Sequence, residues 1–172
     1  MTRAADLAKL IAGGGTITVA DNSDTLTLEG TDADANVGPI LNLHRNSSSP
    51  ADDDALGRIS FDGKDDAGNN TTYARIDTQI VDASNGSEDS ALLIHSLTGG
   101  SERERVRITQ TETVFNEGST DLDFRVESDG NTHALFLEGS SGNVGLGTTS
   151  PSAILDVTST DSDAVFLRSS QS

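Results

Sequence analysis

Acidic side chains form clusters that have the composition of cation-binding loops. Asp32, Asp34 and Asn36 stand at the first three ligand positions of an EF-hand loop. Val37 and Leu43, however, occupy the positions where that loop requires a glycine and a bidentate glutamate. The match therefore fails, and a loose Ca²⁺ site in a β-turn stays open as an alternative. The preferred interpretation is that the acidic clusters are soluble turns, at 31–36, 51–55, 62–70 and 158–164.

Two carboxylate pairs, Asp121 with Asp123 and Glu102 with Glu104, have the groups that glycoside hydrolysis uses. Ligand pockets are commonly lined by aromatic side chains, yet the chain has no Trp, one Tyr and five Phe that alternate as core residues do. It also has no Gly-x-Ser-x-Gly motif and no cysteine, so the usual activated nucleophiles are missing. The sequence predicts no enzyme activity, no catalytic residue and no bound cofactor.

Three histidines, His44, His95 and His133, are far apart in the sequence, and each lies within or beside a strand pattern. In an oligomer they could converge on an axial metal ion, but a histidine on a strand face is more often structural or solvated. We therefore expect no metal site. His95 is the one to follow, because its strand is the most apolar.

The composition limits both the partners and the core. The chain has 172 residues and a formal net charge of -17, so its surface repels nucleic-acid phosphates and anionic membranes. No apolar stretch approaches the ~20 residues of a membrane span, and we expect neither nucleic-acid binding nor membrane insertion. Burying one Phe side chain stabilises by ~2–3 kcal/mol, less than the cost of ordering a short strand. With only 33% hydrophobic residues, copies of the chain are expected to share one core.

The segment TRAADLAKLIAGGG is the one stretch with convincing helical periodicity. Leu7 and Ile11 are four residues apart, Leu10 widens the apolar stripe, and the glycines that follow end the helix. A helix of about ten residues is not stable alone in water. We therefore assign residues 1–15 to a helix with a glycine-rich hinge, in which Leu7, Leu10 and Ile11 pack on the chain's own β-module, on sister chains or on a docking partner.

After residue 15 the apolar period changes from 3.6 to 2, which predicts strands separated by polar turns. Asp62 and Asp129 each precede a glycine, as does Asn85, and these pairs are typical of hairpin turns. We divide this region into a β-rich module at 16–118 and repeated β-hairpin modules at 119–172. The expected strands are 16–20, 25–30, 39–45, 56–63, 72–82, 90–97, 105–109, 112–115, 122–128, 133–139, 153–157 and 164–169.

Two segments near the end of the sequence echo each other. Residues 124–140 and 155–170 both have the order strand, polar turn, strand, and a looser copy occupies 26–43. This repetition favours stacked modules, and a single hairpin is marginal in water. A threefold bundle would bury the large apolar side chains of these modules near its axis. The candidates for such a trimer core are Phe124, Val126, Phe136, Leu137, Phe166 and Leu167.

The run DLDFRVESDGNTHALFLEGSSGNVGLGTTSPSAILDV, at 121–157, resembles segments that recur in tail fibres of tailed bacteriophages. In those fibres a Gly-Asn-Val-Gly-Ile/Leu-Gly-Thr-Thr-Ser-Pro run often precedes an intramolecular chaperone of the endosialidase type. Residues 73–97 are similar to upstream modules of such fibres, especially those of marine phages. The resemblance implies a homotrimeric β-rich fibre, fixed to the virion by its N-terminal segment. The chain departs from the pattern because no chaperone with Ser/Lys self-cleavage machinery follows before Ser172.

The glycine-rich run within that segment has a structural interpretation. Gly142, Gly145 and Gly147 permit positive φ and close approach of two chain segments, and Pro151 pre-sets a turn. A phosphate-binding loop would need a helix directly after the glycines. The residues that follow have strand periodicity instead, so we expect a joint between modules.

The residue patterns and the resemblance lead to one expectation. The fold is all-β with a short N-terminal helix, and repeated β-hairpin modules form a homotrimeric, fibre-like structure. The function is that of a bacteriophage virion structural protein, a trimeric tail fibre or fibre base made in the host bacterial cytoplasm. Its partners are further copies of itself, phage tail or other virion proteins, and a host surface receptor reached through a distal element. The alternatives are a capsid decoration or head-fibre protein and a polysaccharide-degrading tailspike fragment.

Overall fold

A computed structural model describes residues 16–159 of the chain. This part consists of strands, turns and irregular segments, with no helix among its residues, which confirms the expected all-β class for it. The expected helix with Leu7, Leu10 and Ile11 lies outside the described residues, as does the strand expected at 164–169. The described part accordingly has no helix that is long and apolar enough to cross a membrane.

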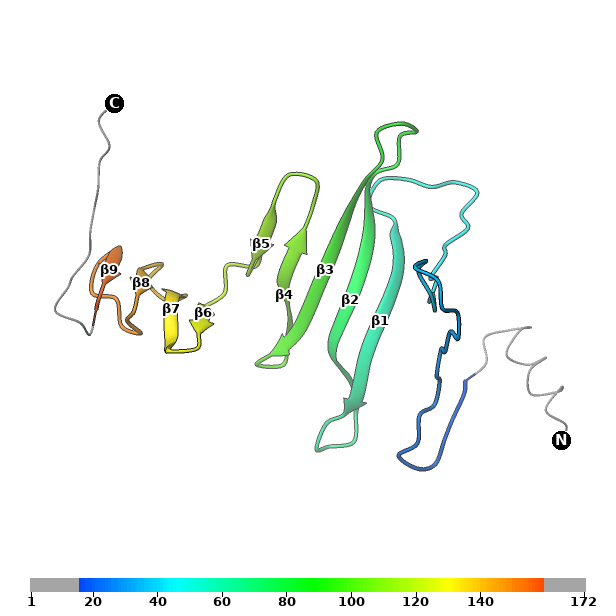
Figure 1. Cartoon of the computed structure of the whole chain (residues 1–172), viewed down its shortest axis with the longest axis horizontal. Coiled ribbons are helices and arrows are strands. Elements are labelled where there is room, and N and C mark those ends of the chain that lie inside the picture. The colour runs from blue at the N-terminus through cyan, green and yellow to red at the C-terminus, as the bar shows by residue number, and fades with distance from the viewer. Residues whose placement is uncertain (1–15, 160–172) are drawn as a thin grey trace, which may run out of the picture. The chain divides into compact units, whose positions relative to one another are not determined.

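The first sheet contains five antiparallel strands in sequence order (Figure 1). Each strand pairs with its neighbour in the chain, so the sheet is a β-meander. The alternation of apolar and polar residues predicted all of these strands. They are β1 (Ala55–Lys64), β2 (Asn70–Asp82), β3 (Asp89–Thr98), β4 (Ser101–Ile108) and β5 (Thr113–Phe115).

The second sheet contains four strands, β6 (Phe124–Ser128), β7 (Asn131–Leu137), β8 (Val144–Leu146) and β9 (Leu155–Val157). Strands β6, β7 and β8 pair antiparallel, whereas β9 runs parallel to β8. The hairpin expected at 124–140 is present. Strand β8 was missed, and β9 does not begin a second antiparallel hairpin in this sheet. The boundary expected at 118/119 falls in the segment that joins the two sheets.

Hairpin turns were expected at three dipeptides in which a glycine follows an aspartate or an asparagine. Asn85 lies in the turn between β2 and β3, where Gly86 has a φ of 91°, and Asp129 lies in the turn between β6 and β7. The turn expected at Asp62 is wrong, because β1 continues through this position to Lys64. A Cβ at the following Gly63 would be 3.1 Å from the Tyr73 ring. That glycine therefore makes room for an aromatic side chain within the sheet.

No strand forms between residues 16 and 54, although strands were expected at 16–20, 25–30 and 39–45. Those predictions, and the looser hairpin copy at 26–43, are wrong for the chain by itself. Alternation gives a segment one apolar face, but a strand also needs a neighbour that pairs with its backbone. No such ladder forms here, and side chains such as Leu26 and Ile40 stay exposed. By its contacts, Met1–Asn42 is a unit distinct from Leu43–Ser172, and both sheets belong to the second unit.

The interior of the described part is small. Its buried apolar residues are Ala91 and Leu93 in β3, exposed to 1% and 6%, and Phe136 in β7. Large apolar side chains on each of the nine strands remain exposed. An antiparallel sheet usually packs one apolar face against a core. Neither sheet has such a cover among the described residues.

Candidate interaction surface

One face of the first sheet has an uninterrupted apolar row. Ile59 of β1 lies beside Ile76 of β2, which lies beside Ile94 of β3. Val106 of β4 and Phe115 of β5 continue the row to the far edge of the sheet. Ile59 is 42% exposed and Phe115 is 54% exposed. The row crosses five strands and contains no charged residue.

The second sheet repeats this arrangement. Phe124 of β6 lies beside Leu137 of β7, and Leu137 lies beside Val144 of β8. Leu155 of β9 is the register partner of Val144 and ends the row, with 59% of its surface exposed. On this face, too, apolar side chains from neighbouring strands are aligned and open.

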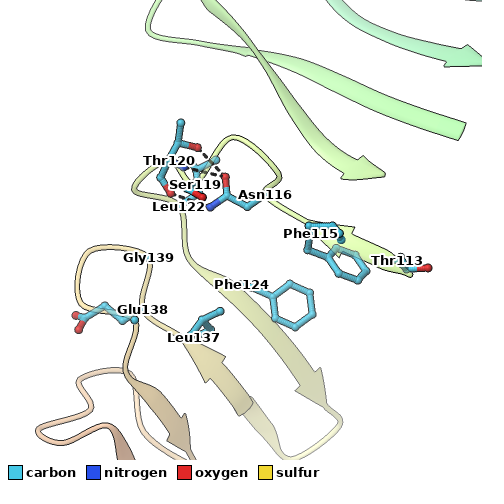
Figure 2. A pocket seen from close by; sticks show the side chains of 12 residues that line it. Thr113, Phe115, Asn116, Ser119, Thr120, Leu122, Phe124, Leu137, Glu138 and Gly139 are labelled. Atoms are coloured by element: carbon cyan, nitrogen blue, oxygen red, sulfur yellow. Dashed lines mark hydrogen bonds between the residues drawn. The ribbon is translucent and has the colours of Figure 1, made fainter. Parts of the chain in front are cut away.

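The two rows meet where the first sheet is joined to the second. The rings of Phe115 and Phe124 lie 5.0 Å apart between centroids, at an angle of 45° (Figure 2). Residues of β5, β6 and β7, Leu137 among them, line a hollow of about 460 Å³ at this point. We call the combined set the apolar row: Ile59, Ile76, Ile94, Val106, Phe115, Phe124, Leu137, Val144 and Leu155.

The loop between the sheets is fixed by local hydrogen bonds beside this hollow. The Asn116 side-chain amide donates to the carbonyl oxygen of Thr120 at 2.8 Å, and the Thr120 hydroxyl donates to Asn116 Oδ1 at 2.7 Å (Figure 2). Asn116 has a φ of 66°, a conformation that asparagine tolerates better than most residues. Close approach at Gly139 helps as well, because a Cβ there would overlap the backbone of Leu122. These contacts hold Phe115 near Phe124.

The opposite face of the first sheet is charged. Arg58 Nε donates to Asp77 Oδ1 at 2.7 Å, and Arg75 Nε donates to Asp77 Oδ2 at 2.5 Å. His95 Nε2 lies 3.7 Å from Asp77 Oδ2, and its Nδ1 lies 3.3 Å from Oε1 of Glu102, which also pairs with Arg75. Asp77 and His95 are both only 9% exposed. This network joins β1, β2, β3 and β4 and occupies the face on which Leu93 is buried, since Leu93 is the register partner of Asp77.

The charged network makes stability depend on the ionisation of Asp77. Burial by itself raises the pKa of this carboxyl, but hydrogen bonds from Arg58 and Arg75 outweigh it, so the pKa is lowered in the folded chain. Because the folded pKa is the lower one, the carboxylate stabilises the fold above the ordinary value of about 3.9. That contribution is lost as the pH falls through the lowered pKa.

We expect the Asp77→Asn variant to lose stability at neutral pH and to approach the wild type as the pH falls through the lowered pKa of Asp77. Turn hydrogen bonds also lower the pKa of other aspartates, such as Asp65 and Asp156. Because both proteins contain these aspartates, the difference in stability between the two proteins isolates Asp77. Urea unfolding of both proteins at a series of pH values measures the difference. Parallel curves for the two proteins would contradict the role assigned to Asp77.

The expected trimer-core residues divide between the two faces of the second sheet. Phe124 and Leu137 belong to the apolar row, and Val126 lies two residues from Phe124 in the same strand and is exposed. Phe136 points to the other face, because successive residues of a strand alternate. It is 6% exposed within one chain, beside Gly145 and edge-on to His133. Phe136 and Leu137 therefore lie on opposite faces of the second sheet, and the trimer core stays a prediction. Phe166 and Leu167 lie outside the described residues.

The glycine-rich run combines a strand with tight turns. Gly142 and Gly147 have φ values of 73° and 76°, whereas Gly145 lies in β8 without positive φ. A Cβ at Gly145 would be 2.7 Å from the carbonyl oxygen of Thr148, and one at Gly147 would overlap the carbonyl oxygen of Thr158. Pro151 is buried, and its carbonyl oxygen accepts a hydrogen bond from the Asn143 side chain at 3.1 Å. The glycines thus allow backbone segments to pack closely around β8.

The candidate chemical groups are engaged in local contacts. The carboxylates of Asp34 and Asp65 each accept a turn amide, from Asn36 and Asn69, at 2.8 Å. Of the two carboxylate pairs, Glu104 accepts hydrogen bonds from Arg107 at 2.7 and 2.9 Å, Glu102 pairs with Arg75, and Asp123 accepts the Gly139 amide at 3.0 Å. Within residues 16–159, no three His, Asp or Glu side chains are grouped so that they could hold a metal ion.

Sequence reasoning placed the strands of the first sheet but did not identify its apolar face as the candidate surface. The signal was present, since Ile59 and Phe61 alternate with charged or polar residues, as do Val106 and Ile108. What it lacked was the register that aligns Ile59, Ile76 and Ile94, which depends on turn lengths and on the irregularities in the β1–β2 and β2–β3 pairings.

No protein-family profile matches this chain, and a search of curated proteins found no match.

Proposed function

We propose that this protein is a non-enzymatic structural subunit of a bacteriophage virion, a homotrimeric tail fibre or fibre base. The observation that carries the proposal is the apolar row, to which each of the nine strands contributes one apolar residue. A contiguous apolar surface of this kind marks a site of contact with another molecule. A chain with so small an interior needs that contact to complete its core.

The tail-fibre resemblance supports the type of assembly. Residues 121–157 carry it, and they contain the four strands of the second sheet and therefore four of the nine residues of the apolar row. The net charge of -17 and the charged face around Asp77 suit the outside of an assembled rod, because charged surfaces keep separate particles apart. Attachment to the particle is assigned to Leu7, Leu10 and Ile11, and host adhesion to a distal element.

The contacts of the carboxylates favour a structural role over polysaccharide cleavage. Glycoside hydrolysis takes two carboxyl groups across the scissile bond. The hollow beside Phe115 and Phe124 has one, that of Glu138. Glu102 and Glu104 are paired with arginines on the charged face, outside that hollow.

Deleting residues 1–13 in the producing phage tests the attachment. We expect particles whose tails lack this protein and whose adsorption to host cells falls at least tenfold. A Lys9→Ala phage, which keeps the apolar stripe, is the control and should adsorb normally. If the protein is lost from heads rather than from tails, the assignment changes from a tail fibre to a capsid decoration protein. Release of oligosaccharides from host exopolysaccharide by the purified chain would overturn the non-enzymatic assignment.

A further inference from the structure

We infer that the apolar row is the surface through which copies of this chain contact one another. The inference rests on the proposed homotrimer and names the residues of its interface. Sheet faces with Ile59, Ile94 and Leu137 point toward sister chains, and the face with Asp77 points to water. The interface thus extends over the first sheet as well as over the glycine-rich module that carries the tail-fibre resemblance.

The form of the row suits packing of sheet against sheet. Its members in the first sheet are mainly β-branched, with isoleucines on β1, β2 and β3 at consecutive register positions. Apolar rows of two sheets interdigitate at a separation of about 10 Å and form a core there. The same row on a second copy offers a surface of matching width and chemistry.

The area is sufficient for a specific contact. The first sheet is five strands wide, and β4 is eight residues long. At the usual strand spacing and rise, such a face spans roughly 24 by 27 Å, or ~650 Å² on each copy. Two apposed faces would bury on the order of 1300 Å², which lies within the range of stable protein interfaces. The second sheet adds to this area.

The charge distribution favours a copy of this chain over a foreign partner. An acidic protein with a net charge of -17 selects basic partners wherever carboxylates form the contact. The apolar row offers no carboxylate, so it gives a basic surface nothing to pair with. Two copies joined along the row keep the Asp77 network of each chain on the opposite face, away from the contact. The carboxylates of that network are then not forced together.

Single cysteines test the inference directly, because the natural chain has none. Ile59 and Ser60 are adjacent in β1, point to opposite faces, and are both exposed within one chain. In the full-length protein at neutral pH, we expect N-ethylmaleimide to label the Ile59→Cys thiol at least tenfold more slowly than the Ser60→Cys thiol. The two rates should become equal in urea. Leu137→Cys and Arg125→Cys form the corresponding pair in the second sheet, since Leu137 belongs to the row and Arg125 is the register partner of Phe136.

The mass of each variant in solution separates the possible outcomes. Protection of Ile59→Cys and Leu137→Cys in a trimer supports the inference. Equal labelling within each pair, in a protein that is still trimeric, overturns it and leaves the proposed homotrimer intact. Equal labelling in a monomer overturns both. If a cysteine unfolds one sheet, the pair in the other sheet still decides between these results.

Discussion

The Ile94→Asp variant is expected to be monomeric at concentrations where we expect the wild type to be trimeric. Ile94 lies on the central strand of the first sheet, between Ile76 and Val106 of the apolar row. Within one chain the side chain is 37% exposed, so an aspartate there meets water and costs little beyond β-propensity. In the assembly each copy would bury an unpaired carboxylate. Several kcal/mol per charge corresponds to at least roughly a thousandfold weaker association.

Two matched variants separate a lost interface from a damaged sheet. Ile94→Val keeps an apolar, β-branched side chain in the row, and Ser60→Asp introduces the same charge on the opposite face of the same sheet. Both should stay trimeric in analytical ultracentrifugation. Because the only apolar side chains that the first sheet buries by itself are Ala91 and Leu93, dissociated Ile94→Asp should also unfold at a lower temperature. If Ile94→Asp stays trimeric and its thermal unfolding midpoint is unchanged, the row does not lie at the interface.

The Gly147→Ala variant is expected to disrupt the second sheet far more than Gly142→Ala. Both glycines have positive φ, which costs an alanine about 1–2 kcal/mol. At Gly142 a Cβ meets open space, whereas at Gly147 it overlaps the carbonyl oxygen of Thr158. The Thr158 amide donates to the Leu146 carbonyl oxygen at 2.9 Å beside this point, so displacing it opens the β8–β9 pair.

Chemical denaturation and amide exchange measure this difference. The free energy of unfolding of Gly142→Ala should fall only by the cost of placing an alanine at positive φ. That of Gly147→Ala should fall by more than ~3 kcal/mol, the upper end for most single substitutions. Exchange should accelerate at the amides of Val144 and Thr158 in the Gly147→Ala variant alone. Similar losses in both variants would indicate that close packing around β8 contributes nothing beyond the backbone angles.

The sequence was a good guide wherever the signal was local. Period-2 alternation and the Asn85 turn signal anticipated the strands of the first sheet and the β2–β3 connection. Strand β8 was missed because a three-residue strand that itself contains a glycine has no visible period, and its pairing with β9 depends on close backbone approach at Gly147. The turn signal at Asp62 failed because a bulge and the Tyr73 ring keep β1 extended there.

The errors between residues 16 and 54 have a different cause. Alternation indicates that Leu26 and Leu28 share a face, and it cannot indicate which strand will pair with their backbone. Within residues 16–159 no strand pairs with this segment. The candidate surface was likewise only partly predictable. Phe124 and Leu137 were anticipated from the repeat, but the row on the first sheet follows from register. Phe136 is buried on the face opposite to Leu137, because successive residues of β7 alternate.

The mass of the full-length protein in solution tests the central claim most directly, which is that copies of this chain complete one another's interior. Light scattering coupled to size exclusion at micromolar concentration should give about 54 kDa, three times the chain mass of 17.9 kDa. Thermal unfolding should then shift to lower temperature on dilution, because folding and association are linked. A cooperative transition independent of concentration, at a mass of 17.9 kDa, would contradict the claim.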